Sequence, residues 1–340
     1  MSNITNAQNP FYGQYHTPHG TVPFDRIETE HYEPAILEGI KLQNAEIEAI
    51  IQNPEKADFS NTIEAFEESG ELLDKVVAVF GNMLSAETND DLQELAQKIM
   101  PLLSEHSNNI TLNEKLLARV KEVYNQKETL QLTQEQKQLL ENAYNSFVRH
   151  GANLEGEARE EYRRLTNELS KLTLTFSENN LKETNAYQML LTKKESLAGL
   201  PEIIIEAAAE TAKSEEKEGW AFTLHAPSYV PFMTYSDNRD LRQKLYMAYN
   251  TKCTHDNEFN NIDIVKNIAN TRMKIAQLLG YKDYAEYTLK KRKEDYINSL
   301  YEEIDNLREQ EKKEGKNVSR SIKNREDKIS RLMAGGFSTK

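Results

Sequence analysis

Histidine, glutamate and cysteine are the residues that bind catalytic zinc, so their spacing decides whether this chain can form such a site. The sequence contains seven histidines: His16, His19, His31, His106, His150, His225 and His255. None is followed directly by glutamate, and no two lie four positions apart, so the His-Glu-x-x-His pattern is absent from the sequence. We therefore predict no catalytic, cofactor-binding or metal-binding residue in this chain.

Two other groups of histidines have a weaker potential to bind metal. His16 and His19 are three positions apart, but Pro18 lies between them in a segment that we expect to be extended. His255-Asp256 together with Glu258 could chelate an ion weakly, although the same residues suit a polar loop at the start of a helix.

Nucleophile and phosphate motifs are also missing. The single cysteine, Cys253, cannot form an internal disulfide, and we interpret it as a half-buried small residue near a helix end. Neither a Gly-x-Ser-x-Gly elbow nor a phosphate-binding glycine loop occurs. Acidic pairs such as Glu67-Glu68 and Asp90-Asp91 are typical of solvated helix faces in an acidic chain.

The segment Trp220–Met233 has an unusual density of aromatic residues and prolines. We expect a strand to run into an aromatic turn bracketed by Pro227 and Pro231, after which Ser236 or Asp237 caps the next helix. Two interpretations remain open at this stage. The segment is either a packed corner or one wall of a peptide-binding cleft.

Composition excludes several classes of protein. The chain has 340 residues, of which 42 are Lys or Arg and 55 are Asp or Glu, for a formal net charge of -13. Such a charge repels a phosphate backbone, so we expect no nucleic-acid partner. No run of about eighteen apolar residues occurs and the first residues do not resemble a signal peptide, so we expect a cytoplasmic protein with no membrane partner.

The elements that must position these residues are mostly helices, because apolar residues recur at spacings of three and four. The predicted helices cover residues 33–51, 60–84, 90–106, 116–124, 133–147, 155–180, 206–218, 237–250, 262–279, 282–289 and about 297–307. Short strands are predicted near 187–191 and 219–224. The fold class is therefore mainly α and multi-helical, with a small β element near 187–224.

Four parts of the chain differ in composition and in the spacing of their apolar residues. Residues 1–32 form an extended arm that we expect to be tied down by its aromatic side chains, and residues 33–183 form a helical subdomain. Residues 184–313 combine the small sheet with further helices. Residues 314–340 show no clear apolar period, so we expect them to be disordered, or out-of-frame translation from about residue 319.

Six short segments carry a resemblance to a known family. They are Asn9–Phe11, Pro23–Ile27, Glu30–Ala35, Asn61–Gly70, Leu224–Tyr229 and Leu279–Ala285. Together, and in this order, they resemble the M3 family of zinc oligopeptidases, with the bacterial peptidyl-dipeptidases (dipeptidyl carboxypeptidases) as the nearest members. The resemblance covers about residues 9–310.

The resemblance implies both a fold and a chemistry. It implies an elongated helical half of a two-lobed molecule, whose lobes flank a channel that admits short peptides and excludes folded proteins. It also implies that zinc-activated water attacks the peptide carbonyl, with the glutamate of the His-Glu-x-x-His helix as general base and a further glutamate as third ligand. No position of this sequence matches those motifs, so we expect the chain to be the amino-terminal half, without bound zinc and inactive alone.

Alternatives to this interpretation follow from the same residues. The chain could instead be a non-catalytic helical module that binds peptides or a protein partner. A third possibility is complementation by a separate polypeptide that carries the missing catalytic lobe. Under the first interpretation we expect exposed apolar area around residues 220–233 and 262–289, and whether the chain is an enzyme stays open.

Overall fold

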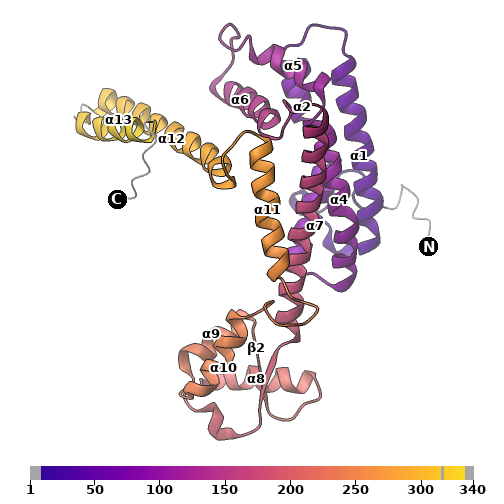
Figure 1. The fold of residues 1–340 in the computed structure, drawn as a ribbon, viewed down its shortest axis with the longest axis vertical. Helices are drawn as coiled ribbons and strands as arrows, with labels where there is room; N and C mark the ends of the chain where they lie inside the picture. Colours follow the sequence, from indigo (N-terminus) through magenta and orange to yellow (C-terminus); the bar gives the residue numbers. More distant parts are fainter. Residues whose placement is uncertain (1–8, 315–317, 334–340) are drawn as a thin grey trace. The chain divides into compact units, whose positions relative to one another are not determined.

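The computed structural model describes residues 9–314 and 318–333, and it is mainly helical with a small two-stranded sheet (Figure 1). The predicted fold class is therefore confirmed. The chain divides into two compact units, residues 1–271 and residues 272–340.

The aromatic arm lies against the first long helices. It contains two short 3-10 turns, η2 (Pro18–Gly20) and η3 (Phe24–Arg26). Phe11 is fully buried, with its ring centroid 5.3 Å from that of Tyr32. Lys75 Nζ donates hydrogen bonds to the carbonyl oxygens of Phe11 and Gly13, at 3.2 and 2.8 Å. Burial of Phe11 and the bonds from Lys75 thus anchor the arm around residues 11–13, whereas Phe24 is exposed; residues 1–8 lie outside the described residues.

Four long helices form the main body of the first unit. They are α1 (Thr29–Gln52), α3 (Glu71–Ala86), α4 (Asp90–Thr111) and α7 (Gly156–Ala186). Helix α1 packs on α3 and α4, and α4 packs along α7 (Figure 1). Gly39 permits the close approach of α1 to α3, because a Cβ there would lie 2.9 Å from the Cα of Leu73. The core between these helices contains Ile36, Val76 and Phe80, all fully buried.

A second apolar cluster lies among shorter elements. These are η4 (Phe59–Glu64, a π-helix), α2 (Ala65–Glu67), α5 (Glu114–Tyr124) and α6 (Gln134–Arg149). Ile63, Val120 and Phe147 fill the space between them. A capping box starts α6, since the Thr133 hydroxyl accepts from the backbone N–H of Gln136 and the Gln136 side chain accepts from the backbone N–H of Thr133.

The predicted helix over residues 60–84 is wrong in its continuity. The chain instead turns at Gly70, whose φ of 86° lies in the left-handed region that favours glycine. The backbone N–H of Gly70 donates to Glu46 Oε2 at 2.8 Å. A Cβ at Gly70 would lie 2.3 Å from Gln43 Nε2. Contacts from α1 therefore fix the break between the two helices. The spacing of apolar residues along the chain does not reveal such contacts.

Residues 187–250 form a small subdomain within the first unit. Strands β1 (Gln188–Leu191) and β2 (Trp220–Thr223) pair antiparallel, with Met189 opposite Phe222. Around them lie η5 (Lys194–Leu197), α8 (Glu202–Ser214), α9 (Ala226–Tyr235) and α10 (Arg239–Asn250). Met189, Phe222, Phe232 and Leu245 form its core. The predicted small β element is confirmed.

The predicted aromatic turn after β2 is wrong, because residues 226–235 form helix α9. Pro227 lies in the first turn, where the missing N–H costs no intrahelical hydrogen bond. Pro231 lies inside the helix and removes one such bond. Burial of Phe232 against Phe222, with ring centroids 4.6 Å apart in an edge-on arrangement, offsets that loss.

Two long helices follow α11 (Ile262–Leu278): α12 (Tyr284–Glu314) and α13 (Ser319–Met333). The expectation of a disordered tail is wrong for residues 319–333, which form helix α13, whereas their out-of-frame origin stays a prediction. Ile322 and Ile329 are seven positions apart, so they share a face of α13 and pack with Leu300 and Ile304 of α12. Two apolar residues suffice here because the partner helix supplies the rest of the cluster. Residues 334–340 lie outside the described residues.

Candidate functional site

The segment that the sequence singled out, Trp220–Met233, begins with β2 and continues into α9. The backbone N–H of Thr223 donates to Ser228 Oγ at 3.0 Å, which joins the strand to the helix. His225 Nε2 lies 3.1 Å from Asn185 Oδ1, and His225 Nδ1 lies 3.2 Å from Thr223 Oγ1. Both ring nitrogens are therefore engaged, and His225 connects the end of α7 to this corner.

The inner and outer sides of α9 differ. Phe232 faces the core and is fully buried, whereas Val230 is 54% exposed and Tyr235 is 52% exposed. The Tyr229 ring stacks on that of Tyr249 in α10, with centroids 4.2 Å apart and an interplanar angle of 20°. The structure thus shows a packed corner on the inner side of α9, with Val230 and Tyr235 exposed on the outer side, and the peptide-binding wall stays a prediction.

A polar cluster surrounds Glu183 near the end of α7. Its carboxylate accepts hydrogen bonds from the backbone N–H of Cys253 and from Asn257 Nδ2, and it lies 2.7 Å from His255 Nδ1. Burial alone would raise the pKa of Glu183, but these hydrogen bonds, that of His255 foremost, lower it below its ordinary value. Glu183 could not be found by sequence reasoning, because 72 residues separate it from His255.

Cys253 is buried within the same cluster. Burial, together with the neighbouring Glu183 carboxylate, raises the pKa of the Cys253 thiol to about 11. The thiol is therefore protonated at neutral pH, which makes it a poor nucleophile and a poor metal ligand. This agrees with the interpretation of Cys253 as a packing residue near a helix end, although it is more deeply buried than expected.

The residues that the structure describes do not fit a catalytic zinc ion. In the part of the chain that the structure describes, no three His, Cys, Asp or Glu side chains are grouped so that they could hold a metal. His255 and Glu183 would supply two ligands, and the protonated Cys253 is a poor third. His16 and His19 are both exposed, and His19 has a left-handed φ of 60°. No reaction step through zinc is assigned to these residues.

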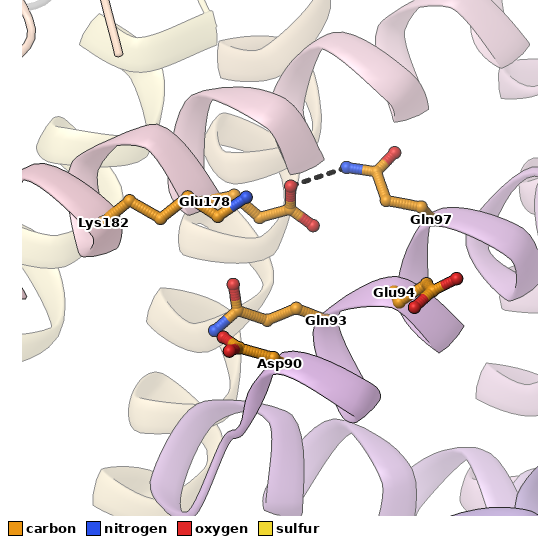
Figure 2. Close-up of a pocket in the computed structure, with 6 residues that line it drawn as sticks. All are labelled: Asp90, Gln93, Glu94, Gln97, Glu178 and Lys182. Atoms are coloured by element: carbon orange, nitrogen blue, oxygen red, sulfur yellow. Dashed lines mark hydrogen bonds between the residues drawn. The ribbon is translucent and has the colours of Figure 1, made fainter. Parts of the chain in front are cut away.

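A polar pocket of about 440 Å³ lies between α4 and α7 (Figure 2). It is lined by Asp90, Gln93, Glu94, Gln97, Glu178 and Lys182. Gln97 Nε2 donates to Glu178 Oε2 at 2.7 Å and so joins the two helices, as Figure 2 shows. Three carboxylates against one ammonium group make the lining negative, which disfavours a peptide carboxylate as its ligand. Asp90, interpreted from sequence as a solvated acid, is thus part of a pocket wall.

Comparison with known proteins identifies relatives among the peptidases. Residues 232–334 match the model of Peptidase family M3. The chain is 34% identical over 284 residues to "Dipeptidyl carboxypeptidase" of Escherichia coli (strain K12), which covers 83% of this chain and 42% of that protein. It is 30% identical over 308 residues to "Oligopeptidase A" of Haemophilus influenzae, covering 89% of this chain and 45% of that protein.

These similarities, together with the mainly helical fold, relate the chain to a class of helical proteins that includes peptidases. The chain belongs to peptidase family M3. It spans less than half the length of the curated relatives that it matches. The family match runs to residue 334. None of the helices in the described ranges is long and apolar enough to cross a membrane.

Proposed function

We propose that this chain takes part in the handling of short peptides and binds them without cleaving them itself. The observation that carries the proposal is the 34% identity over 284 residues to "Dipeptidyl carboxypeptidase", in a sequence that has no His-Glu-x-x-His pattern. When zinc is bound in a family member, it supplies a water molecule of lowered pKa. The described residues of this chain offer no set of ligands that fits that ion.

The surface around α9 is the part of the chain that best suits peptide binding. Tyrosine rings offer a large apolar area together with a hydroxyl group, and both match the mixed surface of a peptide. Tyr229 and Tyr249 are stacked beside the exposed Val230, and β2 and α10 hold them in place. In this proposal the segment Trp220–Met233 is the wall of a peptide-binding surface, and the packed core beneath it makes that wall rigid.

A second candidate function is docking to a polypeptide that carries a zinc site. Exposed apolar side chains on α11 favour it: Ile262 and Val265 are three positions apart on one helix face and are 40% and 48% exposed. Such a stripe is typical of a surface that another protein covers. This candidate predicts that the partner, and not a short peptide, protects α11 from hydrogen exchange.

A binding titration with a short blocked peptide tests the proposal. Trp220 is the only tryptophan and lies in β2, so its fluorescence reports on this subdomain. The probe is an N-acetylated, C-amidated alanine-glycine hexapeptide, added to the full chain with and without zinc. We expect a saturable change in fluorescence and intact peptide by mass spectrometry. Absence of saturation up to millimolar peptide would overturn peptide binding, and chelator-sensitive cleavage would overturn the non-catalytic role.

A further inference from the structure

Helix α10 carries cations and tyrosines along a single face. Arg239, Arg242, Tyr246 and Tyr249 recur at spacings of three, four and three, which places them on one side of the helix. The inward face of α10 is apolar. Its residues Leu241, Leu245 and Ala248 pack into the core of the small subdomain. Tyr246 is 50% exposed and Tyr249 is 39% exposed, although both are large aromatic side chains.

Neighbouring elements extend this face beyond the helix. The Tyr229 ring of α9 stacks on Tyr249, and Lys252 Nζ lies 4.5 Å from the centroid of the Tyr249 ring. We call the resulting surface the basic tyrosine stripe. It consists of Arg239, Arg242, Tyr246, Tyr249, Tyr229 and Lys252.

The charge on the stripe is opposite to that of the chain. Its three cations have no carboxylate among them, in a chain whose formal net charge is -13. Among the residues that the structure describes, none of the three forms an ion pair: Arg242 donates to the carbonyl oxygen of Ser236, and Lys252 donates to Thr184 Oγ1. The nearest acid in the helix sequence, Asp240, falls on the far side of α10. Within the described part of the chain, the stripe therefore presents positive charge that no carboxylate neutralises in an ion pair.

We propose that the basic tyrosine stripe binds acidic peptide segments, with carboxylates at the arginines and the peptide chain across the tyrosine rings. Arginine pairs with carboxylates through two parallel N–H donors, and tyrosine contributes contact area at a low entropic cost. The inference rests on the proposed function, which names short peptides as the ligands, and it adds a preference for acidic peptide sequences. A nucleic acid is disfavoured because the chain as a whole is negative and three cations contact few phosphates.

Matched peptides test the proposal. The two probes are blocked hexapeptides of alternating alanine and glutamate or alanine and glutamine, titrated into the full chain at low salt. Each exposed charge contact contributes a modest free energy, so two contacts predict roughly fivefold tighter binding of the glutamate peptide. This preference should disappear near 1 M salt, where charges are screened within about 3 Å. Equal binding of both peptides overturns the stripe proposal and leaves the proposed function standing, whereas binding of neither contradicts both.

Variants on opposite faces of α10 locate the site. The preference is measured as the logarithm of the ratio between the affinities for the glutamate and glutamine peptides. Arg239→Gln should reduce this logarithm by about half. Lys244→Gln removes the same charge from the other side of the helix and should leave the preference unchanged. Tyr246→Ala should weaken both peptides alike, and circular dichroism should show unchanged helicity in all three variants. Equal effects of the two charge variants, or tighter binding of a six-nucleotide oligothymidine than of the glutamate peptide, would overturn the proposal.

Discussion

Replacing Phe232 by alanine tests whether α9 packs inward as a helix. Phe232 is fully buried, and its ring meets Phe222 edge-on at a centroid distance of 4.6 Å. Truncation of a buried phenylalanine costs about 3–5 kcal/mol, since apolar contacts are lost and a cavity remains. With a urea dependence of about 2 kcal/mol per molar, the unfolding midpoint of this subdomain should fall by roughly 2 M. We therefore expect a large, local loss of stability.

The assay follows urea unfolding through the fluorescence of Trp220, which lies two residues from Phe222 in β2. Val230→Ala is the matched control, because Val230 lies on the same helix but is 54% exposed, and its effect should stay within about 0.5 kcal/mol. Phe232→Leu, which keeps most of the apolar volume, should fall between the two and remains measurable if the alanine variant does not fold. Equal midpoints for the alanine variants of Phe232 and Val230 would refute the inward packing of α9.

Three further predictions concern the backbone and the polar cluster. Gly70→Ala should lower the free energy of unfolding by about 1–2 kcal/mol, because alanine is strained at a φ of 86° and its Cβ meets Gln43; an unchanged thermal midpoint would contradict this. Glu183→Gln should destabilise the chain at pH 7 and reduce its sensitivity to acid. The pKa of Glu183 is lowered in the folded state, so the stabilisation by its charge is present at neutral pH and is lost as the pH falls through the pKa of the folded state. Parallel curves of stability against pH for wild type and variant would argue against this prediction. The Cys253 thiol, with its pKa raised to about 11, should react with iodoacetamide at pH 7.5 far more slowly in the folded chain than in urea, and equal rates would exclude its burial.

Features set by local sequence were predictable. The capping box of Thr133 and Gln136 involves residues three apart, so the sequence alone fixes its geometry. The strands β1 and β2 followed from a change of apolar period near residues 187 and 219. The family resemblance drawn from short segments agrees with the match to Peptidase family M3.

Features set by distant contacts were not predictable in this way. The break at Gly70 depends on Glu46 and Gln43 of α1, which lie more than twenty residues away in the chain. The cluster around Glu183 likewise forms only because the loop at Cys253–Asn257 returns to the end of α7. Helix α13 was missed because its few apolar residues gain their burial from α12. In each case the element depends on a residue that is distant in the sequence, and the local spacing of apolar residues does not identify such a residue.

The central claim is that the chain binds short peptides while its own residues form no zinc-dependent catalytic centre. Equilibrium dialysis of the full chain against zinc and the blocked alanine-glycine hexapeptide together, with metal content and peptide integrity measured on the same sample, tests it most directly. We predict bound and intact peptide with far less than one zinc ion per chain. One tightly held zinc ion per chain, with peptide cleaved in its presence and spared by a chelator, would contradict the claim.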